Sequence, residues 1–359
     1  MLGVAIVGAR RGLSLVSVFQ AHPATEVTVV CDVVAERAEA QARAHSIPHS
    51  TSSFDEVCAS DEVDLVYIAS PPPAHVPQSV QALAAGKHVL SEVPALWKPE
   101  EAAELVRAVR ASSARYMMAE NMAYFAWVQS YDSMVREGFI GEPVYAECEY
   151  VHSLPERMIE TTPTGERKPT WRASLGPAQY CTHDLGPILR MFDDRVQTVV
   201  GMNTGSHLLR EPKVIDAEVI LCHTVRGRVI KFLGSFVNAR PGSLHYFSLY
   251  GTRGVLESPR TTSEPHRLWS DRIPYTDQPA ALQLGASHPH LTGKVPGGGH
   301  GTSEWLMVDD FVRAIEKGVE PPIGVYDALD WSLPGLLGHL SAEEGSKPYE
   351  VPDLRALAD

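Results

Sequence analysis

The sequence predicts an α/β domain over residues 1–122, followed by an α+β domain over residues 123–359. Before residue 122, short apolar strand patterns alternate with helical stretches, which is typical of a parallel sheet covered by helices on both faces. After Tyr124, strand patterns follow one another with few helices between them, which indicates a mainly antiparallel sheet. The length of 359 residues is sufficient for two domains with a substantial core.

Each element of the first domain follows from a local pattern. Continuous apolar runs such as GVAIV and VDLVYIA predict buried strands, while stretches rich in alanine and charged residues predict helices. The strands are expected at 3–7, 26–31, 63–69 and 87–91, and the helices at 13–22, 35–44, 76–85 and 99–111.

The second domain is read in the same way. Helices are expected at 127–137, 182–192 and 303–317, and strands at 144–151, 196–203, 214–224, 228–237 and 244–250. The segments 153–179 and 259–299 are predicted to be long loops. Loops of this length are uncommon unless they line a site or an interface, so both are candidates for a functional role.

Composition excludes several classes of function. The formal net charge of −13 argues against a nucleic-acid or anionic-membrane partner. No apolar run reaches the roughly 20 residues of a membrane span, and the N-terminus enters a strand pattern directly, so we expect a cytoplasmic protein. The five cysteines are scattered and form no Cys-x-x-Cys pair, and no residue cluster suggests a metal site.

The stretch VGARRG, residues 7–12, is the first chemical signal. Gly8 ends a strand and opens a helix, where a backbone can approach a pyrophosphate, so Gly8, Ala9, Arg10, Arg11 and Gly12 are candidate cofactor-binding residues. The spacing departs from G-x-G-x-x-G, because positions 10 and 13 are Arg and Leu.

Asp32 strengthens the prediction of dinucleotide binding. It lies 24 residues after Gly8, at the end of the second strand, where an acid takes the adenosine ribose hydroxyls. An acid there disfavours a 2′-phosphate and predicts NAD over NADP, although Arg10 or Arg11 can neutralise a phosphate. The alternative interpretation is that Gly8 is only a tight turn and Asp32 a helix cap.

Residues 64–95, DLVYIASPPPAHVPQSVQALAAGKHVLSEVPA, resemble the Gfo/Idh/MocA oxidoreductases, and the resemblance covers essentially the whole chain. It implies an N-terminal Rossmann domain, a second domain with an open sheet, NAD as cofactor and a sugar or cyclitol as substrate. The further cofactor-binding residues that it implies are Ser70, Pro71, Pro72, His75, Glu92, Pro94 and Asn121.

Two residues of the proton relay that is usual in this family are missing. The usual Glu-Lys-Pro reads Glu92-Val93-Pro94, and the usual Asp-x-Gly-x-His ends in Ile188 instead of histidine. A dehydrogenase still needs a base within hydrogen-bond reach of the alcohol proton, and neither Val nor Ile can serve.

Five segments resemble the branch that contains glycoside hydrolase family 109: EVPA (92–95), YMMAEN (116–121), GEPVYAECEYVH (141–152), YCTHDLGP (180–187) and GGHGTSEWLM (298–307). The resemblance implies hydrolysis of α-N-acetylgalactosaminides with NAD kept bound. The sugar is oxidised at C3, the aglycone leaves after loss of the C2 proton, water adds, and the hydride is returned.

The same resemblance assigns Tyr180 and His183 to the chemistry at the C3 hydroxyl and the C2 proton, with Tyr124 as a further acid/base candidate. Tyr180 and His183 are three residues apart at a predicted helix start, so they share one face of that helix. His183 is the preferred base, because an unperturbed imidazole titrates near neutrality. His300 is expected to contact a substrate hydroxyl. The alternatives are a core tyrosine, a helix cap at 182–183 and an exposed loop histidine.

Glu92 follows a strand end, where doubly wound sheets bind ligands. We expect it, with Pro94, near the nicotinamide ribose, where it positions cofactor or substrate hydroxyls; the alternative is a cap of the following helix.

Three functions are open at this point: a redox-neutral NAD-dependent glycosidase, an NAD-dependent sugar or cyclitol dehydrogenase, and a non-catalytic NAD or sugar sensor. The expected partners are a small sugar or glycoside and further copies of the chain, because an open sheet leaves an apolar face for a homodimer or homotetramer.

Overall fold

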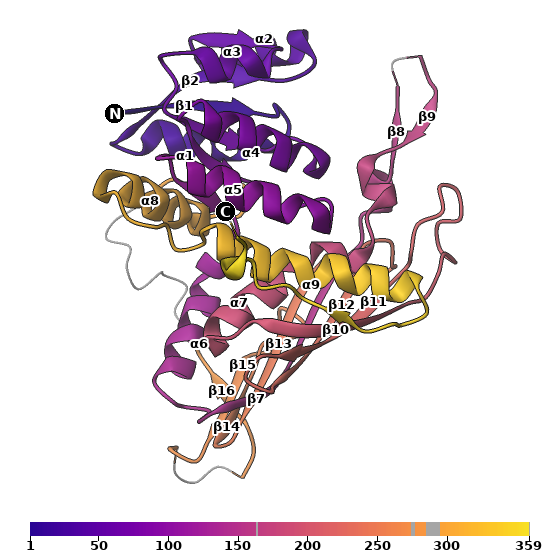
Figure 1. The fold of residues 1–359 in the computed structure, drawn as a ribbon. Helices are drawn as coiled ribbons and strands as arrows, with labels where there is room; N and C mark the ends of the chain where they lie inside the picture. Colours follow the sequence, from indigo (N-terminus) through magenta and orange to yellow (C-terminus); the bar gives the residue numbers. More distant parts are fainter. Residues whose placement is uncertain (163, 274–276, 285–294, 359) are drawn as a thin grey trace. The chain divides into compact units, whose positions relative to one another are not determined.

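The computed structural model describes residues 1–162, 164–273, 277–284 and 295–358. The chain groups into two compact units. The first contains Met1–Phe125 and the described parts of Ser287–Leu329 and Asp353–Asp359, and the second contains the described parts of Ala126–Ala286 together with Asp330–Pro352. In Figure 1, the first unit is coloured from indigo to purple, with part of the yellow C-terminal region.

The first unit is built on a parallel sheet whose order is β3-β2-β1-β4-β5-β6 among the described residues. These strands are β1 (Leu2–Val7), β2 (Thr25–Cys31), β3 (His49–Thr51), β4 (Leu65–Ile68), β5 (His88–Ser91) and β6 (Tyr116–Met118). The order reverses between the neighbours β1 and β4, and a doubly wound sheet binds ligands at such a reversal. This is the Rossmann-type architecture that the sequence predicts, so the fold prediction is confirmed.

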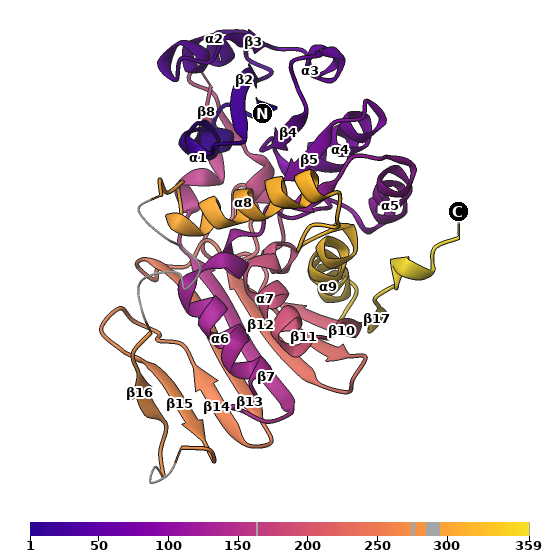
Figure 2. The same ribbon diagram turned by 90° about the vertical axis from the view of Figure 1, so that its left-hand side faces the viewer.

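Helices pack around this sheet in two groups. Helix α1 packs with α8, and α4 packs with α5 (Figure 2). The helices of the unit are α1 (Val16–Ala21), α2 (Ala35–Ala44), α3 (Phe54–Ala59), α4 (His75–Ala84), α5 (Ala102–Ala111) and α8 (Thr302–Lys317), with the 3₁₀ helices η1 (Arg11–Leu15), η2 (Pro72–Ala74), η3 (Pro99–Glu101), η4 (Asn121–Tyr124) and η8 (Leu354–Ala356). The predicted helix 13–22 is therefore divided between η1 and α1.

The central strands are buried because both faces of the sheet are covered. Val4, Ala5 and Ile6 of β1 have no exposed surface, and neither do the four residues of β4. This explains why their sequences are continuous apolar runs without alternation.

The second unit is built on a mixed, mostly antiparallel sheet whose order is β16-β15-β14-β13-β7-β12-β11-β10-β17 in the described part of the chain. Strands β7 and β12 run parallel, and the other pairs are antiparallel. The strands are β7 (Pro143–His152), β10 (Val196–Asn203), β11 (Glu218–Thr224), β12 (Val229–Ser235), β13 (Ser243–Gly251), β14 (Gly254–Glu257), β15 (His266–Ser270), β16 (Ala280–Leu282) and β17 (Tyr349–Glu350). The predicted mainly antiparallel sheet is confirmed.

Helices α6 (Ala126–Arg136) and α7 (Thr182–Phe192) pack on each other, and α7 packs against β7, β12 and β13 (Figure 2). The face beneath is apolar and includes Cys148, Phe232 and Phe247, which are fully buried. Helix α9 (Val325–Glu343) crosses from one unit into the other along the chain.

The two predicted long loops are partly wrong. Segment 153–179 contains a hairpin of β8 (Ile159–Thr161) and β9 (Arg167–Pro169) and the 3₁₀ helices η5 (Pro155–Arg157) and η6 (Trp171–Ser174), and η7 (Pro177–Tyr180) begins within it. Segment 259–299 contains β15 and β16, and its residues 274–276 and 285–294 lie outside the described residues. These elements are short and rich in polar residues, so their sequences lack a clear hydrophobic period.

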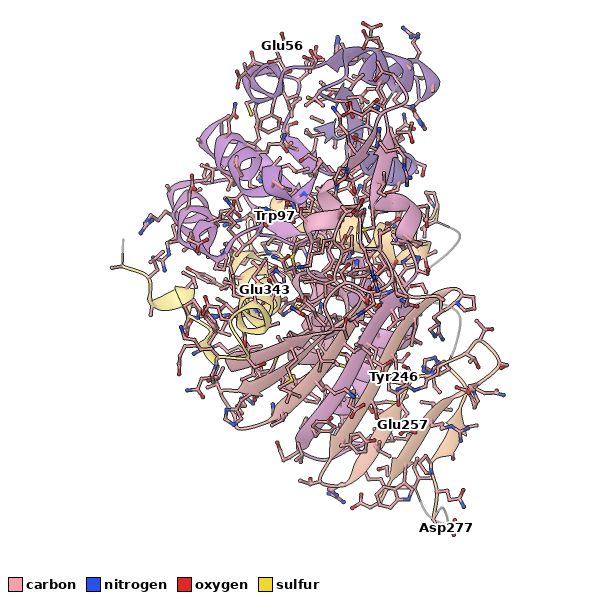
Figure 3. The ribbon with its side chains drawn as sticks, turned by 90° about the vertical axis from the view of Figure 1, so that its right-hand side faces the viewer. Glu56, Trp97, Tyr246, Glu257, Asp277 and Glu343 are labelled. Carbon is pink, nitrogen blue, oxygen red and sulfur yellow. The ribbon has the colours of Figure 1, made fainter. Side chains whose placement is uncertain are left out.

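The face of this sheet opposite α7 carries exposed apolar side chains. Met202, Leu221, Val229 and Tyr250 are between 37% and 64% exposed. The face also carries Tyr246 and Glu257, both labelled in Figure 3. We propose that it pairs with the same face of a second copy, because monomers rarely expose large apolar patches.

Light scattering at micromolar concentration is expected to give a mass of a dimer or tetramer of the 39.2 kDa chain. Leu221→Lys, which places a cation beside Lys231 in the exposed face, is expected to shift the mass toward the monomer. Val33→Lys in the first unit, where Val33 is 90% exposed, is the control that leaves the mass unchanged. A wild-type monomer would exclude the proposed pairing.

Candidate functional site

The turn after β1 brings the backbone of two strand ends into contact. Gly8 has a φ of 98°, which glycine adopts without strain, and a Cβ there would lie 2.5 Å from the carbonyl oxygen of Ala69. A Cβ at Gly12 would lie 2.7 Å from Cγ2 of Ile6, so Gly12 permits close packing of η1 on β1. The stretch VGARRG, although it departs from G-x-G-x-x-G, thus keeps the two glycines, Gly8 and Gly12, that the turn requires. The turn lies where the strand order reverses.

Asp32 is buried and tied to this turn. One carboxylate oxygen accepts a hydrogen bond of 2.9 Å from the backbone N–H of Ala9, and the other accepts bonds from Val34 N–H and from the Arg37 guanidinium. Asp32 therefore fixes the turn as well as presenting a carboxylate beside it. Arg10 and Arg11 were the predicted candidates for neutralising a phosphate. Arg10 is exposed, and Arg11 is paired with Glu92 and Glu304. The cation beside Asp32 is instead Arg37, which was not predicted.

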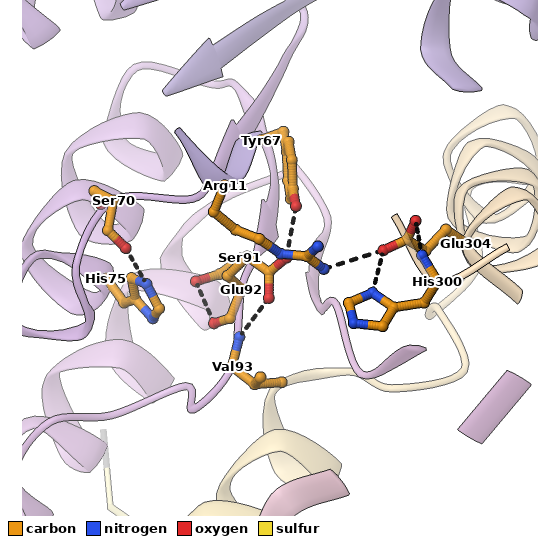
Figure 4. Close-up of polar contacts among 9 residues, drawn as sticks. All are labelled: Arg11, Tyr67, Ser70, His75, Ser91, Glu92, Val93, His300 and Glu304. Atoms are coloured by element: carbon orange, nitrogen blue, oxygen red, sulfur yellow. Dashed lines mark hydrogen bonds and ion pairs between the residues drawn. The ribbon is translucent and has the colours of Figure 1, made fainter. Parts of the chain in front are cut away.

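Glu92 has a cationic partner from a distant part of the sequence. Its Oε1 accepts a hydrogen bond of 2.8 Å from Nε of Arg11 and one of 2.6 Å from the Tyr67 hydroxyl (Figure 4). Burial, followed by the charge of Glu92, raises the pKa of Tyr67 well above its ordinary value, so the phenol remains a hydrogen-bond donor. Glu92 is 6% exposed, and its side chain caps no helix in these contacts.

The guanidinium of Arg11 also reaches Glu304 at the start of α8. Its Nη2 lies 3.0 Å from Oε1 of Glu304, which also accepts a hydrogen bond from His300 Nδ1 at 2.9 Å. Burial alone would raise the pKa of Glu304, but the hydrogen bonds from His300 and the charge of Arg11 outweigh it and lower the pKa. His300 is about half exposed. Through Glu304, the loop before α8 is thus linked to Arg11 in the turn at Gly8–Gly12, which we call the dinucleotide turn (Figure 4).

His75 connects the ends of β4 and β5. Its Nδ1 lies 2.8 Å from the carbonyl oxygen of Pro94, and its Nε2 lies 2.9 Å from that of Ser70. Burial lowers the pKa of the ring, against the two carbonyls, which raise it. The bond between Val93 and Pro94 is cis. Pro71, which is exposed, precedes η2, and Pro72, which is buried, is its first residue.

Two of the buried side-chain donors in the first unit are candidates for contact with a ligand. The side-chain amide nitrogen of Asn121 and the hydroxyl of Ser14 are buried and form no hydrogen bond with any described residue. Tyr124, at the end of the same 3₁₀ helix as Asn121, is 3% exposed. Together with the turn at Gly8 and the carboxylate of Asp32, these donors fit a dinucleotide, which offers phosphate and hydroxyl acceptors.

The second unit gathers a cluster of aromatic and imidazole rings. Tyr180 and His183 lie edge to face with their ring centroids 5.3 Å apart, and His183 lies 5.5 Å from Tyr150 of β7. Tyr150 is stacked on His245 of β13 at 4.4 Å and also touches Phe236. We call Tyr150, His152, Tyr180, His183, Phe236 and His245 the ring cluster.

The position of Tyr180 is set by the buried carboxylate of Glu218, which pairs with His339. Glu218 accepts a hydrogen bond from the backbone N–H of Ala178, in the turn of η7 that ends at Tyr180, and another of 2.7 Å from His339. Burial would lower the pKa of His339, but the hydrogen bond and charge of Glu218 outweigh it and raise the pKa. The hydrogen-bonded pair of Glu218 and His339 therefore holds the start of the segment that carries Tyr180 and His183.

Sequence reasoning missed several residues around the turn after β1 and several residues of the ring cluster. Tyr67, Arg37 and Glu304 in the first unit carry no motif of their own. Tyr150 and His245 lie on predicted strands, and His152 directly follows the first of them; only the pairing of β7 with β13 brings the three together. A local signal that the sequence did carry is the two-residue spacing of Tyr150 and His152, which places both on the same face of a strand.

The pattern of the oxidoreductase family with an NAD-binding Rossmann fold matches residues 2–120, and that of the glycosyl hydrolase 109 C-terminal domain matches residues 213–356. The chain is 30% identical to a glycosyl hydrolase family 109 protein of Saccharopolyspora erythraea, over 98% of this chain and 82% of that protein. It is 29% identical to one of Solibacter usitatus, over 98% and 87% of the two chains.

A solved structure of levoglucosan dehydrogenase in complex with NADH and L-sorbose shares the fold, with a TM-score of 0.83 and 20% identity over 99% of this chain and 100% of that chain. The fold, the dinucleotide turn and these matches define an NAD-dependent enzyme of the Gfo/Idh/MocA oxidoreductase type, with NAD as its cofactor. The chain belongs to glycosyl hydrolase family 109.

Two further properties follow from the described residues alone. They contain no group of three or more His, Cys, Asp or Glu side chains arranged to hold a metal ion. Their helices include none that is long and apolar enough to span a membrane.

NAD is expected to bind more tightly than NADP, because the Asp32 carboxylate repels a 2′-phosphate. Asp32→Ala is expected to weaken NAD binding by about 1.5–3 kcal/mol for each charge-assisted hydrogen bond lost, and to reduce the ratio of NAD affinity to NADP affinity. Arg37→Met, which removes the cation beside Asp32, is the matched variant and should increase this ratio. Fluorescence titrations of both cofactors measure this, and equal affinities in the wild type would contradict the assignment.

Proposed function

We propose that the protein is an NAD-dependent glycosidase that acts by transient oxidation of the sugar at C3, followed by elimination and hydration. The observation that carries the proposal is the ring cluster, which places two phenols and three imidazoles together in the second unit. Val93 and Ile188, at the positions of the usual relay, are 2% and 0% exposed and cannot exchange protons. The relatives named as glycosyl hydrolase family 109 proteins support a glycoside as the substrate.

In this proposal, NAD⁺ would supply the hydride acceptor for C3. The residues of the first unit would hold it: Asp32 at the adenosine ribose, the Gly8–Gly12 turn at the pyrophosphate, and Ser70–Pro72, His75, Glu92, Pro94 and Asn121 around the rest. Glu92 acts mainly through Arg11, whose guanidinium it fixes beside the turn.

The ring cluster is proposed to move the protons. Oxidation at C3 acidifies the C2 proton, and His183 removes it as a general base. The aglycone then leaves with the electron pair of its bond to C1, and Tyr180 or Tyr124 protonates the leaving oxygen. Water adds to C1, the proton returns to C2, and His300 holds a sugar hydroxyl.

The second candidate is an NAD-dependent dehydrogenase of a free sugar or cyclitol. The same imidazoles and phenols can accept the proton of an alcohol, so the ring cluster is compatible with net oxidation as well. The third candidate, a sensor without turnover, would use the same cofactor site.

We propose that residues 1–122 bind NAD and that residues 123–359 serve substrate binding and oligomerisation.

Stoichiometry separates the three candidates. With an aryl α-N-acetylgalactosaminide and a catalytic amount of NAD⁺, the expected result is many equivalents of phenol released without accumulation of NADH. One NADH formed per free sugar oxidised, with no phenol released, would establish the dehydrogenase. Cofactor and sugar binding without either product would establish the sensor.

A further inference from the structure

A buried carboxylate lies against one imidazole of the ring cluster. Nδ1 of His245, on β13, lies 3.1 and 3.2 Å from the two carboxylate oxygens of Asp184, in the first turn of α7. The Asp184 side chain has no exposed surface, while that of His245 is 20% exposed. The carboxylate is thus hidden beneath the ring, and the ring is accessible.

The carboxylate fixes which nitrogen of His245 carries the proton. A carboxylate accepts hydrogen bonds, so Nδ1 must be the protonated nitrogen, which leaves the lone pair of a neutral ring on Nε2. Within the described part of the chain, Nε2 of His245 forms no hydrogen bond. A proton acceptor of defined orientation therefore exists in the cluster in addition to His183.

The neighbours of His245 hold the ring in place. It is stacked on Tyr150 with an interplanar angle of 21°, and it stands nearly perpendicular to His183 at 6.0 Å between centroids. His152 also lies nearby, and its pKa is lowered by burial and then by His245. The two imidazoles are thus distinct groups set at right angles, each able to face a different atom of one small ligand.

The proposed reaction needs two acceptors. Oxidation removes the hydroxyl proton at C3, and elimination removes the C–H proton at C2 of the same sugar. An imidazole that has taken the first proton cannot take the second until it has lost the first. One base for both steps would therefore require proton release to water between them.

We propose that His245, oriented by Asp184, is the group that accepts the proton of the C3 hydroxyl, while His183 accepts the C2 proton; this rests on the proposed function. The O–H bond breaks and its proton goes to Nε2 of His245. The hydride leaves C3 with the electron pair of the C–H bond and goes to NAD⁺, and the C=O bond forms. The reverse transfer returns the proton when C3 is reduced again. Asp184 is a positioning residue that selects the tautomer.

The two proton transfers can be measured separately. Oxidation at C3 is followed in a single turnover by the absorbance of NADH, and exchange at C2 is followed by deuterium uptake into a supplied 3-keto sugar in D₂O, which needs no oxidation. His245→Gln is expected to slow the first by about 10²–10⁴-fold and to leave the second and the NAD affinity within about twofold. The control is His223→Gln, an exposed histidine of β11, which leaves both rates unchanged.

A spectroscopic readout tests the positioning role of Asp184 without turnover. The nitrogen chemical shifts of a ¹⁵N-histidine-labelled protein are expected to show His245 as the Nδ1–H tautomer in the wild type. Asp184→Asn is expected to lose this single tautomer and to slow oxidation less than His245→Gln does. Because His245→Gln keeps Asp184 intact, it decides the matter independently of how well Asp184→Asn folds.

Unchanged oxidation in His245→Gln, or an equal loss of oxidation and C2 exchange, would overturn the assignment. So would an Nε2–H tautomer in the wild type. Failure of the proposed function looks different: the wild type would then reduce NAD⁺ with a sugar yet release no aglycone and exchange no deuterium at C2. The effect of His245→Gln on NAD⁺ reduction would still test His245 in that case.

Discussion

Replacement of His183 by alanine is expected to slow glycoside cleavage by about 10²–10⁴-fold, as loss of a general base typically does. The ring of His183 lies among Tyr150, Tyr180 and His245, so it is the imidazole in contact with most of the proposed acid/base groups. Exchange at C2 of the sugar is expected to fall by the same factor. NAD affinity is expected to stay unchanged, because the dinucleotide turn is formed by residues of the other unit.

Tyr180→Phe is the companion variant, because it keeps the ring and removes only the hydroxyl. If Tyr180 protonates the leaving oxygen, substrates with a good phenol leaving group should be affected less than alkyl glycosides. Cleavage by His183→Ala at the wild-type rate would remove His183 from the mechanism. A large loss of NAD affinity in the same variant would indicate a structural disturbance instead.

Arg11→Met is expected to lower the free energy of unfolding by about 3 kcal/mol at neutral pH. Its guanidinium contacts two carboxylates, Glu92 at 2.8 Å and Glu304 at 3.0 Å, whose side chains are 8% and 0% exposed. Removal of one partner of a buried pair leaves a buried charge without its counter-ion and costs about 3–5 kcal/mol. We take the lower end because the side chain of Arg11 is itself 35% exposed.

The pH dependence of this loss has a definite sign. In the folded protein the pKa of Glu304 is lowered, so its contribution to stability is present above the unfolded pKa of about 4.3 and disappears as the pH falls through the folded pKa. The difference in the free energy of unfolding between wild type and Arg11→Met should therefore be largest near neutrality and shrink below about pH 4.

Arg43→Met, which removes an exposed pair with Glu39, is the control and should change stability by less than about 1 kcal/mol. Urea unfolding measures both, and an Arg11→Met protein as stable as the control would contradict this account.

The sequence was sufficient to predict the architecture because burial leaves a local signature. Strands such as β1 and β4 are covered on both faces, so their residues are continuously apolar. The predicted bounds of β10 and α7 agree with the structure, 196–203 and 182–192. Shorter elements such as β3 and β15 were missed, since three to five residues of mixed polarity carry no period.

The candidate site was predictable only where its residues belong to a motif. Glu92 has no cation beside it in the chain, and its partner Arg11 is 81 residues away. Arg11 and Glu304 are separated by 293 residues, and Asp184 and His245 by 61. Such pairs are set by how the sheets and helices pack, and a single sequence holds no local pattern for them.

The labelling pattern of the product sugar tests the central claim most directly. A glycoside is cleaved by the purified protein in D₂O, and the released sugar is analysed by NMR. We predict deuterium at C2, protium retained at C3, and no NADH accumulating, because the C2 proton exchanges with solvent while the hydride is borrowed and returned. Release of a sugar with protium at C2, or production of NADH from a free sugar without any glycoside cleavage, would contradict this.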